Sequence, residues 1–129
     1  MLGKQVLHIL VVENDPVTAS SITRVMTGLG WQVDFAASGR AAQKLHLEKE
    51  YDVVLLDVAL PDVEGTQLCA QIKQQQPSPP VLFISATEKG VATLPHHPGD
   101  DIAPDVSDIK DIIARCQALA TSATFPVSA

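Results

Sequence analysis

The chain has 129 residues, the length of one domain and enough to bury a hydrophobic core. Hydrophobic residues make up 46% of the sequence and charged residues 19%, proportions that exclude a disordered chain. The formal net charge is -6 and no segment gathers Lys and Arg into a patch, so direct binding of nucleic acid through its phosphates is not expected.

The first 16 residues predict a buried strand followed by a helix start. Residues 6–12 are apolar and rich in β-branched side chains, and the polar segment Glu13-Asn14-Asp15-Pro16 ends the strand. Asn14 or Asp15 can cap the helix, and proline suits its first turn. Gly28 and Gly30 end it. The apolar residues at helical spacing, which predict its buried side, are Ile22, Val25, Met26 and Leu29.

The next two strands enclose a second helix. Residues 31–36 alternate and predict a more exposed strand. Ser38 caps a helix that runs through Glu50. Residues 51–56 form the most hydrophobic strand, which runs straight into Asp57. The expected buried side of this second helix holds Ala41, Ala42, Leu45 and Leu47.

After a turn at residues 61–65, a helix is predicted from about 66 to 76 and a fourth strand at 81–84, ending at Ser85. Residues 87–99 contain Pro95 and Pro98, so any helix there must be short or irregular. We expect the His96-His97 pair between these prolines to be a solvated loop rather than a metal site.

The C-terminal quarter predicts a brief fifth strand within residues 101–104 and a final helix. Ser107 or Asp108 starts this helix. The two cysteines, Cys69 and Cys116, lie far apart without metal-ligand spacing, and we expect two buried thiols. The apolar stripe of the last helix consists of Ile109, Ile112, Ile113, Cys116 and Leu119.

The five alternating strands and helices predict an α/β fold, a doubly wound parallel sheet with right-handed crossovers. We expect one domain over residues 1–121, with 122–129 as a tail or linker. The start of the chain lacks a long apolar run, which predicts neither a signal peptide nor a membrane span and favours the cytoplasm.

Polar residues follow the strands at the edge where such sheets carry their sites. Glu13 and Asn14 follow the first strand, Asp57 ends the third, Ser85 ends the fourth and Asp105 follows the fifth. Oxygen ligands of this kind suit Mg²⁺, and a carboxylate beside that ion can attack phosphorus to form an aspartyl phosphate. In the alternative interpretation, Asp57 caps the following loop and the acidic residues after the first strand only start a helix.

Three segments resemble the receiver domain of bacterial response regulators, the CheY-like superfamily. Residues 11–16, VVENDP, look like the family's acidic segment, and residues 81–86, VLFISA, like its fourth strand with the switch hydroxyl. The most specific match is residues 51–65, YDVVLLDVALPDVEG, which is very similar to the phosphoacceptor strand and loop. The resemblance implies a flavodoxin-like sheet of strand order 2-1-3-4-5.

The resemblance also implies the roles of individual residues. It makes Asp57 the phosphoacceptor and Ser85 the switch hydroxyl, with Glu13, Asn14, Asp57 and the backbone carbonyl of Ala59 around Mg²⁺. It implies a histidine kinase or phosphotransfer protein as donor, a downstream effector domain or protein, and a possible homodimer.

Three positions depart from the family pattern. Asn14 replaces the second acid of the pocket, so we expect weaker Mg²⁺ binding. Asp105 stands where the family has a lysine that pairs with the phosphoryl group, which replaces attraction with repulsion. Ile102 replaces the aromatic residue that rotates on activation. These departures leave two hypotheses open: a phosphoryl-accepting switch, and a degenerate receiver that binds proteins without phosphorylation. An aspartyl phosphatase is disfavoured, because those enzymes need an acid at the position of Ala59.

Overall fold

The structure, a computed structural model, describes residues 6–75, 77–84 and 100–124. The described helices are α1 (Pro16–Gly28), α2 (Gly39–Glu48), α3 (Gly65–Lys73) and α4 (Ile109–Thr124). The strands are β1 (His8–Val12), β2 (Gln32–Ala36), β3 (Val53–Asp57), β4 (Val81–Ile84) and β5 (Asp101–Ile102).

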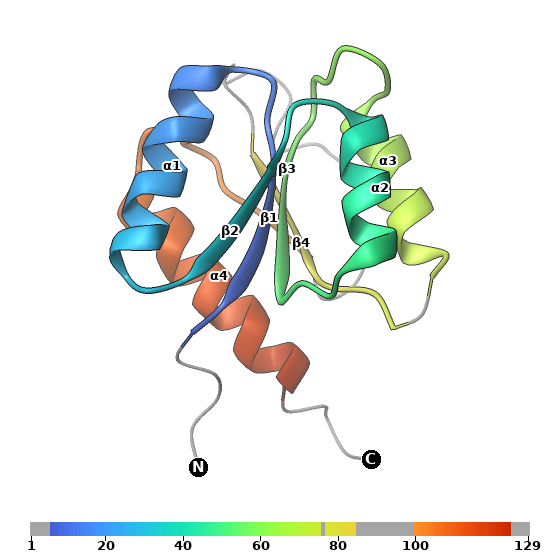
Figure 1. The fold of residues 1–129 in the computed structure, drawn as a ribbon. Coiled ribbons are helices and arrows are strands. Elements are labelled where there is room, and N and C mark those ends of the chain that lie inside the picture. The colour runs from blue at the N-terminus through green and yellow to red at the C-terminus, as the bar shows by residue number, and fades with distance from the viewer. Residues whose placement is uncertain (1–5, 76, 85–99, 125–129) are drawn as a thin grey trace.

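The strands form one five-stranded parallel sheet in the order β2-β1-β3-β4-β5, which confirms the predicted fold class. Helices α1 and α4 cover one face of the sheet, and α2 and α3 cover the other (Figure 1). The central strands β1, β3 and β4 are almost entirely buried because helices pack on both faces. Their continuous apolar runs explain why the sequence pattern was strongest there.

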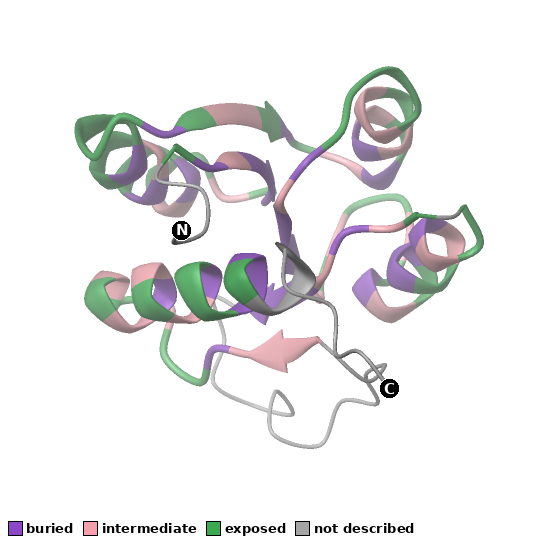
Figure 2. Ribbon diagram, turned by 90° about the horizontal axis from the view of Figure 1, so that it is seen from below, coloured by how far each residue is buried: buried purple, intermediate pink, exposed green. Residues whose placement is uncertain are grey.

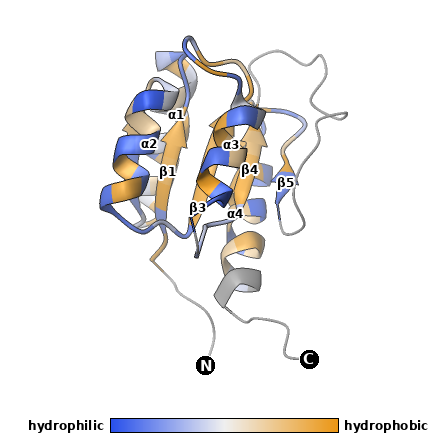
Figure 3. Cartoon of the chain, turned by 90° about the vertical axis from the view of Figure 1, so that its right-hand side faces the viewer, coloured by the Kyte–Doolittle hydropathy of each residue, from blue (hydrophilic) through white to orange (hydrophobic). Residues whose placement is uncertain are grey.

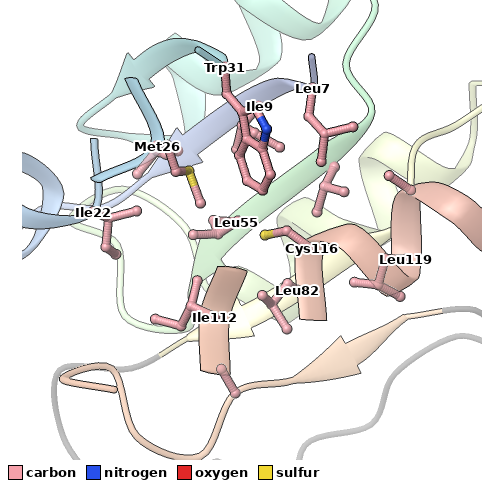
Figure 4. Packing of buried hydrophobic residues seen from close by; sticks show 14 of the residues in the cluster. Leu7, Ile9, Ile22, Met26, Trp31, Leu55, Leu82, Ile112, Cys116 and Leu119 are labelled. Atoms are coloured by element: carbon pink, nitrogen blue, oxygen red, sulfur yellow. The ribbon is translucent and has the colours of Figure 1, made fainter. Parts of the chain in front are cut away.

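Each face of the sheet has its own hydrophobic core. Figure 4 shows the cluster between the sheet and α1 and α4, where Trp31 and Met26 pack near Leu55 and Cys116. The second cluster lies under α2 and α3 and includes Leu68, Ile72 and Phe83. The buried residues of each helix lie on the side that faces the sheet, and the exposed residues lie on the side that faces solvent (Figure 2). The most hydrophobic residues lie mainly in the strands (Figure 3).

Local capping explains where the helices begin. Asp15 caps α1 by accepting a hydrogen bond from the Thr18 amide, with Pro16 as the first helical residue, and Ser38 caps α2 by accepting from the Ala41 amide. Asp108 accepts from the Asp111 amide at the start of α4. After α1, Gly30 adopts a φ of 86°, a conformation that favours glycine and lets the chain turn into β2.

Three residues predicted to be buried are exposed. Val25 and Leu29 of the first predicted stripe have exposed fractions of 39% and 50%, and Leu47 of the second has 61%. The buried side of α1 consists of Ala19, Ile22 and Met26 alone. Leu47 is two residues beyond the half-buried Leu45, which places it across the helix from the sheet. The apolar pattern was therefore wider than the face that the sheet covers.

The C-terminal part agrees with the predicted brief strand and long helix. Strand β5 has two residues, and α4 buries Ile112, Cys116 and Leu119. Helix α4 extends to Thr124, so residues 122–124 of the predicted tail are helical. The short or irregular helix expected within 87–99, with His96-His97, lies outside the described residues. Both cysteines are buried thiols outside any disulfide, as expected. No described helix is long and apolar enough to cross a membrane.

A buried ion pair joins the end of α3 to the residue before β5. The Lys73 ammonium lies 2.8 Å from a carboxylate oxygen of Asp100, whose side chain is fully buried. The same oxygen accepts a hydrogen bond of 2.8 Å from the amide of Val81 at the start of β4. Lys73 also donates to the Pro79 carbonyl at 2.9 Å. One carboxylate thus connects α3, β4 and the chain entering β5.

Replacing Lys73 with methionine should lower the free energy of unfolding by about 3 kcal/mol, because it removes a cation that lies 2.8 Å from a buried carboxylate oxygen. The matched control is Lys49→Met, since Lys49 pairs with Asp34 at 3.2 Å while its side chain remains 48% exposed. This control should cost less than about 1 kcal/mol. Urea denaturation of both variants measures the difference, and equal losses would contradict a structural role for the buried pair.

Candidate functional site

Two buried carboxylates meet at the carboxyl end of the sheet. Asp57 is the last residue of β3, and Glu13 follows β1, one residue beyond the paired positions Val12 and Leu56. Glu13 is fully buried and Asp57 is 4% exposed. The structure therefore brings together the two acids that the sequence singled out.

Among the described residues, one oxygen of the Glu13 carboxylate accepts a hydrogen bond and the other does not. Its Oε2 accepts a hydrogen bond of 3.1 Å from the Asp15 amide, and the Glu13 amide donates to the Ala36 carbonyl of β2 at 3.0 Å. Its Oε1 is buried without a hydrogen-bond partner among the described residues. Burial, reinforced by the nearby Asp57 carboxylate, raises the pKa of Glu13 to about 8. An acceptor buried in this way requires a proton or a cation.

Asp57 is fixed by the loop that follows it. Its Oδ1 accepts a hydrogen bond of 3.1 Å from the Ala59 amide. The Gly65 amide donates to the Val58 carbonyl at 2.9 Å, which closes the loop between β3 and α3. A Cβ at Gly65 would lie 2.5 Å from the Asp57 carbonyl oxygen, so only glycine permits this approach. The predicted turn at 61–65 is thus a tightly closed loop.

Asn14 and Asp15 have different environments. Asn14 is exposed in the turn after β1, next to Glu13. Asp15 accepts hydrogen bonds from the amide and the hydroxyl of Thr18, which lower its pKa and commit it to capping α1. No group of three or more His, Cys, Asp or Glu residues that could hold a metal occurs in the described ranges. Asn14 is the residue at the position where the resemblance implies a second acid.

Asp105 has a local structural role. Its carboxylate accepts hydrogen bonds from the amide and the hydroxyl of Ser107, at 3.0 and 2.6 Å, and these bonds lower its pKa. The side chain is exposed in the loop before α4. The residue at the expected lysine position is therefore an ionised turn residue. Ile102, at the expected aromatic position, is half-buried against the α2–α3 core. Ser85 lies outside the described residues.

One residue near the site was not identified from the sequence. Asp62, in the β3–α3 loop, accepts hydrogen bonds from the amides of Gly39 and Arg40 at the start of α2. These bonds lower the pKa of its carboxyl group. Its partners are more than 20 positions away, so no local pattern could have indicated this contact.

Oxygen ligands for a hard cation are available at this edge of the sheet. The unsatisfied Glu13 oxygen and the buried Asp57 carboxylate fit Mg²⁺, which prefers oxygen ligands and retains several waters. The amide oxygen of Asn14 and the main-chain carbonyl of Ala59 lie in the two adjoining loops. The donor chemistry thus agrees with the cation that the sequence predicts.

Comparisons with known proteins define the class. A family model for the response regulator receiver domain matches residues 9–95. The chain belongs to this family, the receiver domains of two-component signalling. It is 32% identical over 122 residues to the transcriptional regulatory protein TcrA of Mycobacterium tuberculosis, an alignment that covers 93% of this chain and 48% of TcrA. The chain spans about half the length of the curated relatives it matches.

Solved structures agree on the fold. The response regulator TrrA of Thermotoga maritima, crystallised in complex with Mg²⁺-BeF, has a TM-score of 0.78 at 20% identity, covering 88% of this chain and 98% of that one. The receiver domain of a signal transduction histidine kinase from Syntrophus aciditrophicus has a TM-score of 0.81 at 22% identity, covering 95% and 96%. At these identities the similarity concerns the fold alone.

The raised pKa of Glu13 has a direct consequence for stability. The folded protein holds this proton up to a pH of about 8, whereas an unperturbed carboxyl releases it near 4.5. Between these values the folded state binds more protons than the unfolded state, so stability is full below the lower value and falls as the pH rises toward the upper one.

In the presence of a chelator, we expect the wild-type protein to lose about 1–3 kcal/mol relative to Glu13→Gln between acidic pH and pH 8. Glutamine keeps an acceptor for the Asp15 amide but carries no charge. Urea unfolding of both proteins across this pH range isolates the contribution of Glu13 from that of the histidines. A difference that does not change with pH would show that folding does not raise the pKa of Glu13.

Proposed function

We propose that this receiver domain accepts a phosphoryl group on Asp57. The observation that carries this proposal is the burial of Asp57 beside Glu13 at the carboxyl end of an apolar sheet. Two carboxylates placed together without a cation are costly, so this arrangement favours a site that binds a cation and an anionic group in turn. The membership of the receiver family points to the same chemistry.

The chemistry requires one oxygen of Asp57 to attack phosphorus in line with the leaving group. A new O–P bond forms while the bond from phosphorus to the donor, a histidine nitrogen or a carboxylate oxygen of a small phosphodonor, breaks. The Ala59 amide holds Oδ1 of Asp57 and thereby orients the side chain. Mg²⁺, when bound by Glu13, Asn14, Asp57 and the Ala59 carbonyl, supplies electrostatic stabilisation of the phosphoryl oxygens. Ser85 is the proposed hydroxyl partner of the phosphoryl group.

The substitutions in the site should weaken it without abolishing it. Asn14 contributes an amide oxygen in place of a negative charge, which lowers the affinity for Mg²⁺. Asp105 is exposed and bonded to Ser107, and the described contacts of its side chain lie within its own loop. It offers no positive charge to a phosphoryl group. The complex of TrrA with Mg²⁺-BeF supports the choice of cation for this fold.

The partners follow from the reaction. A histidine kinase or phosphotransfer protein is the proposed donor, which places the domain in the cytoplasm. Because relatives such as TcrA are transcriptional regulators about twice as long, an effector domain or protein is the proposed recipient of the signal. A homodimer is also proposed, and sedimentation of the labelled and unlabelled protein tests it.

Incubation with Mg²⁺ and acetyl phosphate should add one labile phosphoryl group, detected as an increase in intact mass. Asp57→Asn should remain unmodified, because the amide lacks the nucleophilic oxygen. A normal receiver labelled in parallel confirms the reagents. Absence of the adduct on the folded wild-type protein would contradict the proposal.

The second candidate function is a degenerate receiver that binds a partner without phosphorylation. The observation in its favour is Asp105, which puts a negative charge at the position of the family's lysine. In that case the unphosphorylated protein is the active form, and Asp57→Asn retains binding of the partner.

Asn14→Asp tests the proposed cation site, because it supplies the second acid that the family pattern has at this position. We expect it to tighten Mg²⁺ binding by about tenfold, since hard cations respond strongly to ligand charge. Titration by calorimetry measures the change, with Asn14→Ser as a control that offers an oxygen without a charge. If the added acid leaves the affinity unchanged, the turn after β1 does not contribute to the cation site.

A further inference from the structure

The loop between β3 and α3, residues 58–64, is anchored at both its base and its tip. At its base, Ala59 and Glu64 form an antiparallel bridge beside the hydrogen bond from Gly65 to Val58. At its tip, the Asp62 carboxylate reaches the first turn of α2. Its Oδ1 accepts from the Gly39 amide at 2.8 Å, and its Oδ2 accepts from the Arg40 amide at 3.0 Å. Figure 1 places this loop and the start of α2 at the same end of the molecule.

The contact is built for close approach. A Cβ on Gly39 would lie 2.2 Å from Cγ1 of Val63 and 3.3 Å from Oδ1 of Asp62. Glycine at this position therefore lets the loop tip rest directly on the helix start. The negative charge of Asp62 also suits the N-terminus of a helix, where unpaired amides carry partial positive charge. Two charge-assisted hydrogen bonds and a close apolar contact thus join the loop tip to the first turn of α2.

The anchor connects the two halves of the site. One half, the turn with Glu13 and Asn14, is tied to β2 because the Glu13 amide donates to the Ala36 carbonyl at 3.0 Å. The other half is the loop with Ala59. Gly39 lies only three residues after Ala36, so the short connection from β2 to α2 holds both. Ser38, within that connection, caps the helix by accepting from the Ala41 amide and does not contact the loop through this bond.

We propose that Asp62 is a positioning residue for the cation site: by docking the β3–α3 loop on α2, it holds the Ala59 carbonyl at a fixed place relative to Glu13 and Asp57. In this proposal Asp62 is not itself a metal ligand, and its two oxygens accept hydrogen bonds from backbone amides. This inference rests on the proposed function, in which Ala59 contributes to the cation site. It adds a residue that acts through the loop.

The first test measures the dissociation constant for Mg²⁺ from the backbone amide shifts of the ¹⁵N-labelled protein, without any phosphodonor. Asp62→Ala should weaken Mg²⁺ binding by about tenfold, the lower end of the range found when groups that orient metal ligands are removed. Asp62→Asn keeps one acceptor oxygen and should fall between this variant and the wild type. Gly39→Ala should also weaken Mg²⁺ binding, because its added Cβ would push the loop tip away from α2.

Ser38→Ala is the matched control. It removes a hydrogen bond from the same helix start and should lower stability, yet it should leave Mg²⁺ binding within about twofold of the wild type. Urea unfolding shows that each variant is folded during the titration. If Asp62→Ala and Ser38→Ala weaken Mg²⁺ binding equally, the effect comes from α2 in general and the positioning role is overturned.

Acetyl phosphate labelling of the same proteins separates this inference from the proposed function. Both proposals are supported if the wild type is labelled and Mg²⁺ binding is weakened in Asp62→Ala but not in Ser38→Ala. Labelling with unchanged Mg²⁺ binding in Asp62→Ala overturns the positioning role and leaves the function intact. Mg²⁺ binding that depends on Asp62 in a wild type that is never labelled supports the positioning role and overturns the function. A wild type that does not bind Mg²⁺ overturns both.

Discussion

The placement of two carboxylates at the end of an apolar parallel sheet is the constraint on which the site depends. Strands β1 and β3 are adjacent and parallel, so the residues that follow their ends must lie side by side. Glu13 and Asp57 are buried there, and one Glu13 oxygen has no hydrogen-bond partner among the described residues. The pKa of Glu13 rises as a result. Tolerating this cost makes physical sense where a cation or an incoming anion changes the local charge.

The surrounding loops convert that pair into a site with defined geometry. The β3–α3 loop closes on Gly65, orients Asp57 through the Ala59 amide, and rests on α2 through Asp62. The turn after β1 engages Glu13 and is itself joined to β2. Each anchor is a backbone group bonded to a side chain or another backbone group, so the site is held by short, directional contacts and not by packing alone.

Two of the departures from the family pattern, Asp105 and Ile102, fit their surroundings in the fold. Asp105 fits its loop by bonding to Ser107, and Ile102 packs against the core as an apolar residue. The fold therefore accommodates both residues without disruption. The resemblance assigns Asp105 to the position of the family's lysine, and in the proposed site that position would carry a negative charge.

The sequence by itself determined the order of strands and helices, the parallel sheet, and the two acids of the site. These follow from local signals: apolar runs long enough to be buried strands, caps such as Asp15 and Ser38, and acids placed directly after strands. Only the tertiary structure decided how much of the apolar surface of α1 and α2 the sheet covers, and it left Val25, Leu29 and Leu47 exposed. It alone revealed the Lys73–Asp100 pair and the anchor of Asp62 on α2. The physical reason is that these contacts join residues more than 20 positions apart, whose meeting depends on how helices pack across a completed sheet.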